Sequence, residues 1–157
     1  MKGLLLGLML FCLQTSALAQ TYYVLRHFEK APTPDDPPLS TRGIQQANAL
    51  AALLNDKDIQ CIYSTNYQRT LQSVTPLANA LSIKVQLYDP RQPEKLINSL
   101  TTTQGDCVIV GHSNTVPDLV ERLGGTGAPL TEKDYGDVFI LVKDKLRLLD
   151  QHHIVIK

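Results

Sequence analysis

Five polar residues, from four separate parts of the chain, are the candidates for chemistry in this sequence. They are Arg26, His27, Arg69, Asp89 and His112. Arginine presents a planar fork of N–H donors that matches the oxygens of a phosphoryl group, so two arginines can hold one phosphate from two sides. A histidine can attack phosphorus through an unprotonated ring nitrogen, and a second, protonated histidine can neutralise charge in the transition state. These residue types therefore predict an oxyanion pocket able to transfer a phosphoryl group.

Four apolar runs that precede these residues have the composition of short buried strands. They cover residues 21–25, 59–63, 83–88 and 107–110. Apolar residues at helical spacing follow the runs and predict helices over 41–54, 67–81, 93–100 and 116–123. The runs 138–142 and 145–149 are expected to form a terminal antiparallel hairpin. Strands that alternate with helices favour a mainly parallel sheet covered by helices on both faces.

The candidate residues stand where the predicted strands end. Because ligands bind beyond the carboxyl ends of parallel strands, we expect all five at one rim, with Arg69 in the first turn of a helix. Each has a plainer explanation when taken alone. The pair at the end of the first strand could be surface polarity, His112 could be a turn residue, and Arg69 could be a solvated helix side chain. Their joint placement at strand ends favours the functional interpretation.

Four blocks of sequence resemble the histidine phosphatase, or phosphoglycerate mutase-like, superfamily. They are Arg26-His27-Phe28-Glu29, residues 39–47 (LSTRGIQQA), residues 63–70 (YSTNYQRT) and Val110-Gly111-His112-Ser113. Their order and spacing both match, and they extend over nearly the whole chain after residue 20. The resemblance implies a three-layer α/β/α sandwich with a mainly parallel mixed sheet of about six strands. It also implies a covalent phosphohistidine on His27, phosphate binding by Arg26, Arg69 and His112, and no metal or other cofactor.

Departures from the family pattern concern the mouth of the pocket and the proton donor. Phe28 stands where members often have glycine or alanine, which predicts a partly apolar mouth. Ser113 stands where the acid phosphatase branch has an aspartate proton donor. The mutase branch uses a glutamate just after the third strand, and Asp89 is the residue nearest to that position. Asp89 is therefore the candidate catalytic acid.

The spacing of the third and fourth strands bears on how open the site is. About 18 residues separate them, too few for a large cap. The site should therefore be open, and the chain most resembles the short phosphatases of the family, including those that act on phosphohistidine in proteins.

The N-terminal residues have the pattern of a secretory signal peptide. Lys2 precedes the apolar run 3–11, and Ala17-Leu18-Ala19 supplies the small residues of a cleavage site. The run is shorter than the roughly 20 residues that a membrane-spanning helix needs. Bulky Phe11 argues against a lipid anchor on Cys12. We therefore expect a signal peptide over residues 1–19, a histidine phosphatase domain over 20–157, and a protein exported to the periplasm or secreted.

Composition restricts the expected partners. Charged residues make up 19% of the chain, the formal net charge is zero, and no basic block occurs, so nucleic acid is not an expected partner. No run after residue 20 is long enough to span a membrane. Metal is not expected either, because the sequence has no CxxC motif and the adjacent His152 and His153 would point to opposite faces of a strand. The expected partner is a small phosphorylated substrate or a phosphoprotein, and the oligomeric state is left open.

Cys61 and Cys107 lie inside two of the predicted strands. Export would permit a disulfide between them. Direct bridging of adjacent parallel strands is geometrically awkward, however. We therefore expect two buried free thiols, with a bridge as the less favoured alternative.

Two other functions fit part of the sequence. The segment 111–115 resembles the nucleophile elbow of serine hydrolases, but Thr115 stands where a second glycine is needed. That interpretation also leaves Arg26, His27 and Arg69 without roles. A protein of the same fold could instead bind phosphate or a phosphorylated ligand without turnover. The presence of His27 favours the enzyme, because a pure binder needs no nucleophile in line with the phosphate.

Overall fold

The computed structural model describes residues 19–33, 35–144 and 147–157. Strands and helices alternate along most of this part of the chain. The strands are β1 (Gln20–Arg26), β2 (Ile59–Ser64), β3 (Val85–Leu87), β4 (Asp106–Gly111), β5 (Asp137–Asp144) and β6 (Arg147–Val155). The helices are α1 (Thr41–Leu54), α2 (Gln68–Leu81), α3 (Pro93–Thr102) and α4 (Val116–Arg122). The predicted elements are all present, with shifted ends.

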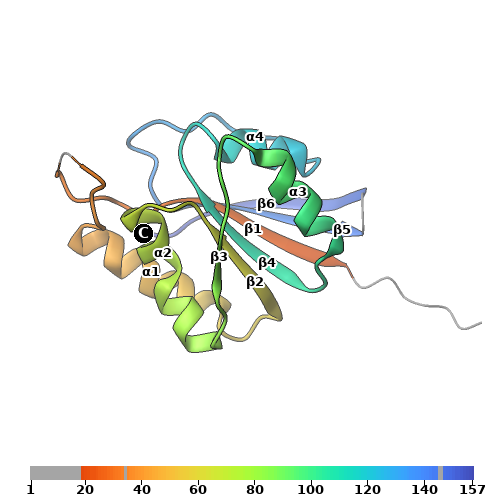
Figure 1. Ribbon diagram of the computed structural model, residues 1–157, viewed down its shortest axis with the longest axis horizontal. Coiled ribbons are helices and arrows are strands. Elements are labelled where there is room, and N and C mark those ends of the chain that lie inside the picture. The colour runs from red at the N-terminus through yellow and green to blue at the C-terminus, as the bar shows by residue number, and fades with distance from the viewer. Residues whose placement is uncertain (1–18, 34, 145–146) are drawn as a thin grey trace, which may run out of the picture.

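The six strands form one mixed sheet in the order β3-β2-β4-β1-β5-β6. Strands β1, β2, β3 and β4 run parallel to their neighbours among themselves. Strand β5 pairs antiparallel with β1, and β6 pairs antiparallel with β5 as the predicted terminal hairpin. The carboxyl ends of the four parallel strands therefore meet at one edge of the sheet, where Figure 1 shows the loops that follow them.

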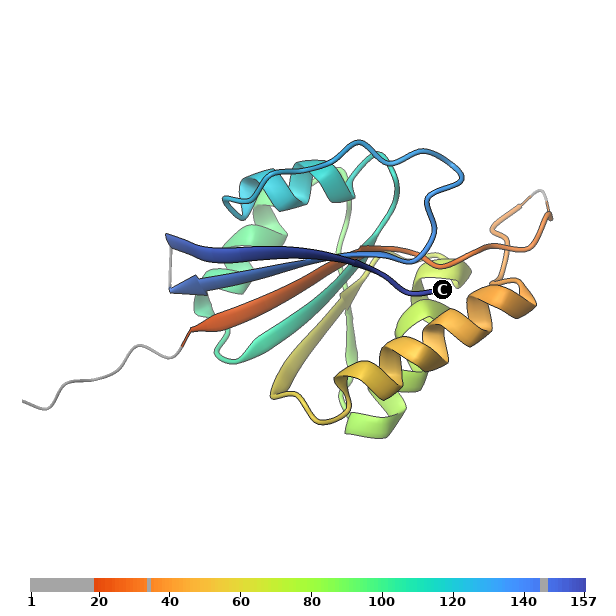
Figure 2. The same ribbon diagram turned by 180° about the vertical axis from the view of Figure 1, so that it is seen from behind.

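Each face of the sheet is covered by two helices (Figures 1 and 2). Each face also has its own apolar core. Helices α1 and α2 bury residues such as Leu50 and Leu77 against one face. Helices α3 and α4 bury residues such as Leu100 and Leu119 against the other. The predicted three-layer α/β/α sandwich, with a mainly parallel mixed sheet of six strands, is confirmed.

The start of α1 shows how tightly the chain after β1 is packed. Ser40 is the N-cap, and its side-chain oxygen accepts a hydrogen bond from the backbone N–H of Gly43. A Cβ atom at Gly43 would lie 2.1 Å from the carbonyl oxygen of Glu29, so a side chain cannot fit there. Glu29 in turn accepts a hydrogen bond from the hydroxyl of Ser40 at 2.7 Å. These contacts fix the segment that follows β1 and His27.

Two strands differ most from their predicted extents. Strand β3 covers three residues rather than six, and β6 continues to Val155, beyond the predicted end at Leu149. The exposed residues of β6 lie on the edge strand, so its sequence lacks the apolar run of a buried strand. Helix α2 continues through Pro76 to Leu81, although a proline inside a helix removes one backbone hydrogen bond.

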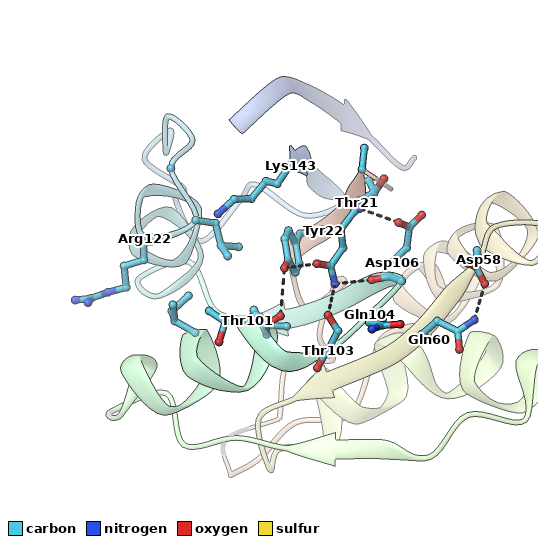
Figure 3. A pocket seen from close by; sticks show the side chains of 17 residues that line it. Thr21, Tyr22, Asp58, Gln60, Thr101, Thr103, Gln104, Asp106, Arg122 and Lys143 are labelled. Atoms are coloured by element: carbon cyan, nitrogen blue, oxygen red, sulfur yellow. Dashed lines mark hydrogen bonds between the residues drawn. The ribbon is translucent and has the colours of Figure 1, made fainter. Parts of the chain in front are cut away.

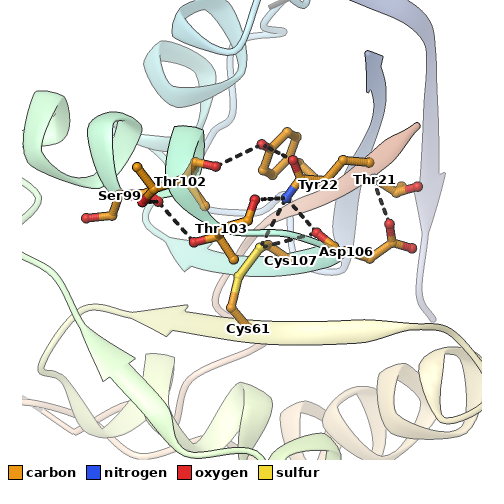
Figure 4. The surroundings of a disulfide bond; sticks show 11 residues. Thr21, Tyr22, Cys61, Ser99, Thr102, Thr103, Asp106 and Cys107 are labelled. Atoms are coloured by element: carbon orange, nitrogen blue, oxygen red, sulfur yellow. Dashed lines mark hydrogen bonds between the residues drawn. A yellow bond between two sulfur atoms is a disulfide. The ribbon is translucent and has the colours of Figure 1, made fainter. Parts of the chain in front are cut away.

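The expectation of two free thiols is wrong, because Cys61 and Cys107 form a disulfide (Figure 4). The two residues are direct partners in the β2–β4 ladder, next to a register irregularity between Ile59 and Cys61. This pairing brings their Cα atoms to 4.7 Å, within the range that a disulfide spans. Both cysteines are buried in the core on the α3–α4 face. The bond therefore ties two adjacent parallel strands together near their amino ends.

The expected signal peptide over residues 1–19 lies outside the described residues, except for Ala19. Within residues 19–33, 35–144 and 147–157, no helix has the length and apolar character needed to cross a membrane.

Candidate active site

Strand β1 brings Arg26 and His27 to the carboxyl edge of the sheet, beside the end of β4. Arg26 pairs with Gly111 in the parallel ladder, and the backbone N–H of His27 donates to the carbonyl of Gly111 at 3.0 Å. Both side chains are buried, Arg26 completely. His112 follows Gly111 directly, so the register of β1 against β4 brings the two histidines together. Their ring centroids are 5.6 Å apart.

His27 is held in the tautomer that a nucleophile requires. Its Nδ1 lies 2.8 Å from the carbonyl oxygen of Phe28. A carbonyl oxygen can only accept, so Nδ1 carries the proton and Nε2 is left with a free lone pair. Burial is the main cause that lowers the pKa of His27 to about 3, and the positive charges of Arg26 and Arg69 act in the same direction. Near neutral pH the ring is therefore uncharged, as attack on phosphorus requires.

His112 is joined to a chain of hydroxyl groups at the end of β2. Its Nε2 lies 3.0 Å from Oγ1 of Thr65, which donates to Oγ1 of Thr70 at 3.0 Å. The Thr70 hydroxyl donates to backbone carbonyls, so all these bonds can exist together only if His112 Nε2 is a donor. Burial lowers the pKa of His112 to about 4, with contributions from Arg69 and Arg26. The ligand-free ring is therefore neutral near pH 7, with a proton on Nε2.

The guanidinium of Arg26 has hydrogen-bond partners at one nitrogen and none at the other two. Nη1 donates to the backbone carbonyls of Thr131 and Asp134, in the loop between α4 and β5. The ring of Tyr135 stacks on the guanidinium, 4.3 Å from the ring centroid to Cζ. Nε and Nη2 are buried and have no hydrogen-bond partner. Nη2 lies 3.2 Å from a carboxylate oxygen of Glu132, but without the alignment of a hydrogen bond.

Arg69 lies in the first turn of α2, as predicted, and its guanidinium stacks on Tyr67 at 4.5 Å. The same Tyr67 ring meets His112 edge-on, with centroids 5.1 Å apart. Nη1 of Arg69 lies 3.5 Å from a carboxylate oxygen of Asp36, in the loop between β1 and α1, whereas its Nε is buried without a hydrogen-bond partner. The side chains of Arg69 and His112 therefore both contact one aromatic ring, that of Tyr67.

The structure does not bring the carboxylate of Asp89 to the histidines. Its hydrogen bonds go to Arg91 at 2.9–3.0 Å and to Gln92 at 3.1 Å. These partners, Arg91 first, lower its pKa well below the ordinary range of an aspartate. Among the described residues, no hydrogen bond or ion pair joins Asp89 to the other four candidates. The role of Asp89 as catalytic acid stays a prediction. In the structure its carboxylate instead accepts hydrogen bonds from Arg91, two residues away.

Phe28 does not line the mouth of the pocket as the sequence predicted. Its side chain is fully buried in the core on the α1–α2 face. Its backbone N–H donates to the hydroxyl of Ser73 at 2.9 Å, and that hydroxyl donates to the carbonyl of Arg69 at 2.7 Å. The backbone after His27 is thereby connected to the helix turn that carries Arg69.

The sequence analysis missed residues in the loop between α4 and β5. Glu132 contacts Arg26 and accepts a hydrogen bond from Ser113 at 3.0 Å, and the ring of Tyr135 lies 5.9 Å from that of His27. Neither residue follows a strand or shows a periodic pattern, so nothing in the sequence pointed to them. Thr65 could have been found, since it follows β2 directly.

Potential metal ligands do not gather in this part of the molecule. Within the described residues, no group of three or more histidine, cysteine, aspartate and glutamate side chains could hold an ion. Independence from metals remains a prediction of the sequence analysis. The positive charge at this edge comes instead from the two arginines.

Residues 22–91 match the family model of the histidine phosphatase superfamily, branch 1. This segment contains Arg26, His27 and Arg69, and it ends before His112. The chain has the fold of the histidine phosphatase superfamily. The resemblance drawn from the four sequence blocks is thereby confirmed.

Solved structures of this fold extend the match beyond residue 91. A protein histidine phosphatase SixA in complex with tungstate matches with a TM-score of 0.68 at 17% identity, over 83% of this chain and 95% of the other. A mycobacterial glucosyl-3-phosphoglycerate phosphatase gives 0.65 at 13% identity, over 88% and 98%. A phosphoserine phosphatase from Entamoeba histolytica gives 0.63 at 15% identity, over 85% and 96%. At these identities the likeness shows the histidine phosphatase fold alone. No curated protein matches the sequence significantly.

Proposed function

We propose that this chain is an exported phosphatase that hydrolyses a phosphomonoester or a phosphoramidate through a phosphohistidine intermediate on His27. The observation that carries the proposal is the set of buried arginine nitrogens without hydrogen-bond partners, Nε and Nη2 of Arg26 and Nε of Arg69. A buried donor left unpaired costs about 1–3 kcal/mol, and more when it is charged. Such groups are explained when a ligand completes them. A phosphoryl group has the oxygens and the negative charge that both guanidinium groups can bind.

The state of His27 supports turnover rather than binding alone. In the first step its Nε2 attacks phosphorus, a P–N bond forms, and the bond from phosphorus to the leaving oxygen or nitrogen breaks. In the second step water attacks phosphorus, the P–N bond breaks, and its electron pair returns to Nε2. The hydrogen bond from Nδ1–H to the Phe28 carbonyl keeps Nε2 available in both steps.

His112 is the candidate for binding an equatorial phosphoryl oxygen. Its Nε2–H donates to Thr65 in the free protein and can donate to phosphate instead. The sequence analysis assigned it a positive charge in the transition state, whereas burial keeps it neutral without a ligand. A bound phosphoryl dianion would raise its pKa, because a nearby opposite charge favours the protonated ring. The proton would then arrive together with the substrate.

Export is proposed from the N-terminal sequence and from the disulfide. Residues 1–19 have the charged start, apolar centre and small cleavage-site residues of a signal peptide. A disulfide such as Cys61–Cys107 persists in oxidising compartments and is rare in the cytosol of mesophiles. The two features point to the same compartment, the periplasm or the extracellular space.

The proposed substrate class is broad. The segment between β3 and β4 contains the ten-residue α3 and little else, so no large cap domain is inserted there. An open rim would admit either a small phosphorylated molecule or a phosphorylated side chain on a protein. The structural neighbours are named as a protein histidine phosphatase, a glucosyl-3-phosphoglycerate phosphatase and a phosphoserine phosphatase. These names support phosphoryl transfer as the proposed chemistry, but they do not favour one substrate.

Trapping the phosphoenzyme tests the proposal. The mature protein is mixed with radiolabelled substrate and quenched within milliseconds, and the label should be acid-labile and alkali-stable, as phosphoramidates are. His27→Ala should abolish labelling and turnover. His152→Ala, which removes an exposed histidine of β6, should retain both. Because Arg26, Arg69 and His112 supply the charge in this proposal, activity should also survive a chelator.

The same experiment decides the alternative of a phosphate-binding protein without catalysis. Such a protein would bind inorganic phosphate in calorimetry but give no labelled enzyme and no turnover with any phosphomonoester or phosphohistidine peptide. An alkali-labile, acid-stable adduct would instead identify a serine or aspartate ester and overturn the assignment to His27.

A further inference from the structure

The side chain of Glu132 occupies a position that the proposed reaction has not yet used. One carboxylate oxygen lies 3.2 Å from Nη2 of Arg26 and 3.6 Å from Nζ of Lys30. The other accepts a hydrogen bond from Oγ of Ser113, the residue after His112, at 3.0 Å. Glu132 therefore bridges the segment after β1, which carries His27, and the segment after β4, which carries His112. It lies directly beside the arginine nitrogens expected to bind the phosphoryl group.

The other carboxylates at this edge are held differently. The carboxylate of Asp89 is engaged by Arg91 and Gln92, and that of Asp134 accepts from the backbone N–H of Thr131 at 2.6 Å. Asp36 contacts Arg69 but also accepts from the backbone N–H of Gln68 at 3.0 Å. The negative charge of Glu132 also acts on His112, whose pKa it raises.

We propose that Glu132 is the proton-transfer residue of this site, giving a proton to the leaving group and then removing one from the attacking water. This inference rests on the proposed function. In the first step the Glu132 carboxyl proton moves to the leaving oxygen as its bond to phosphorus breaks. In the second step the carboxylate takes a proton from water as oxygen attacks the phosphohistidine. This returns Glu132 to its protonated form, and the proton passes to solvent when phosphate leaves.

The charges around Glu132 are consistent with a proton that is taken up when substrate binds. In the free protein the hydrogen bond from Ser113, together with Arg26 and Lys30, lowers its pKa. A phosphoryl dianion that binds Arg26 competes for this positive charge and adds a like charge beside the carboxylate. Both changes raise the pKa of Glu132 and favour protonation. The side chain is 68% exposed, so solvent can deliver that proton.

Leaving groups of different acidity test the assignment. The experiment compares kcat/KM for 4-nitrophenyl, phenyl and ethyl phosphate in the wild type and in Glu132→Gln. Glutamine keeps the shape and can still accept from Ser113, but it cannot donate the proton. A positioned acid contributes about 10²- to 10⁴-fold for a poor leaving group. We therefore expect a loss of about 100-fold or more for ethyl phosphate and of less than about tenfold for 4-nitrophenyl phosphate.

Two further variants provide the controls. Glu94→Gln makes the same change in a glutamate of nearly equal exposure on α3, and it should leave all three substrates unaffected. Asp89→Asn tests the acid that the sequence predicted. A loss that depends on the leaving group in Asp89→Asn, and not in Glu132→Gln, would overturn the proposal. The affinity of each variant for inorganic phosphate shows whether the loop at Arg26 is still in place.

The outcomes separate this inference from the proposed function. If the wild type forms phosphohistidine on His27 but Glu132→Gln loses activity equally on all three esters, Glu132 has only a structural effect and the inference fails alone. If no phosphohistidine forms in the wild type, both proposals fail. A steeper dependence on leaving-group acidity in Glu132→Gln, with normal phosphohistidine formation from 4-nitrophenyl phosphate, supports the assignment.

Discussion

The two ends of the parallel strands contrast in how their polar groups are satisfied. At the carboxyl ends, Arg26 and Arg69 keep buried nitrogens without hydrogen-bond partners, beside two neutral histidines. At the amino ends, Gln20 donates to the carbonyls of Thr103 and Gly105, and a disulfide joins β2 to β4 (Figures 3 and 4). The carboxyl ends thus keep donors available for a ligand, whereas the contacts at the amino ends stabilise the sheet.

A large cavity lies at the amino end, away from the candidate chemistry. Its volume is about 1090 Å³, and its lining includes Tyr22, Leu100, Leu123 and Lys143 (Figure 3). Burial lowers the pKa of Lys143, whose ammonium nitrogen lies 5.9 Å from the Tyr22 ring centroid. The lining holds two cations, Arg122 and Lys143, but among the described residues neither has a buried nitrogen without a hydrogen-bond partner, unlike the two arginines of the carboxyl end. Cavity volume is therefore a poorer guide to the catalytic site than convergent, unsatisfied donors.

The largest expected effect is a difference in kcat/KM between a substitution at the carboxyl ends of the strands and one at the amino ends. Arg69→Lys keeps the charge but removes the planar fork of donors that, in the proposed function, binds phosphate. We expect kcat/KM to fall by about 10²- to 10³-fold, the usual effect of removing one donor to a developing oxyanion. Lys143→Met, at the other end, should leave kcat/KM within about twofold, since the residue lines the cavity at the amino ends of the strands and not the candidate active site. Steady-state kinetics on an aryl phosphate measure both. A large loss in Lys143→Met would show that the amino end takes part in turnover.

The disulfide should affect stability rather than catalysis. The bond closes a loop with a sequence separation of 46, and a disulfide of this kind contributes about 2–4 kcal/mol to the free energy of unfolding. Cys61 lies three residues before the end of β2, about 10 Å along the strand from Ser64. Replacing both cysteines by alanine should therefore lower the denaturation midpoint and leave kcat nearly unchanged in the folded protein.

Chemical denaturation and kinetics at low temperature check this prediction. Wild-type protein treated with reductant under denaturing conditions and then blocked at its thiols serves as the control for loss of the bond without loss of side chains. An equal free energy of unfolding in wild type and double variant, with two titratable thiols in the untreated protein, would show that the cysteines are not bridged in solution.

The sequence predicted the site where the chain follows a buried strand. Strands β1, β2 and β4 are continuous apolar runs, so their ends could be placed within one or two residues, and with them Arg26, His27 and His112. The strand order does not follow from the sequence pattern. The resemblance made the strands of Cys61 and Cys107 neighbours, but a bridge was disfavoured because adjacent parallel strands are awkward to join, and only the register of β2 against β4 shows the two residues as direct partners.

The loops were less predictable, because their contacts are not local in sequence. Glu132 lies about 100 residues from Arg26 along the chain, and no periodicity marks its loop. The converse error concerns Asp89. The sequence placed it at the correct edge, but Arg91, two residues away, binds its carboxylate locally. Sequence position predicts which edge a side chain occupies, whereas the competition among nearby partners decides where its charged group lies.

The smallest expected effect is the contribution of His27, at the carboxyl ends of the strands, to the pH dependence of stability. The pKa of His27 is about 3 in the folded protein and 6.5 in the unfolded chain. Between these two pH values the unfolded chain binds a proton that the folded protein does not. The free energy of unfolding therefore decreases as the pH falls, and the contribution of His27 is fully present only above about pH 6.5. For one such histidine, lowering the pH from 7 to 5 removes about 1–2 kcal/mol. His27→Asn, which can still donate to the Phe28 carbonyl, should lose that part of the pH dependence. Urea denaturation at pH 5, 6 and 7 measures this dependence.

Saturating phosphate should flatten the dependence of wild-type stability on pH, because a bound anion favours the protonated rings. A wild type and a His27→Asn variant with the same slope would mean that His27 takes up its proton in the folded state near its ordinary pKa, and that the carboxyl end is less buried than its contacts indicate.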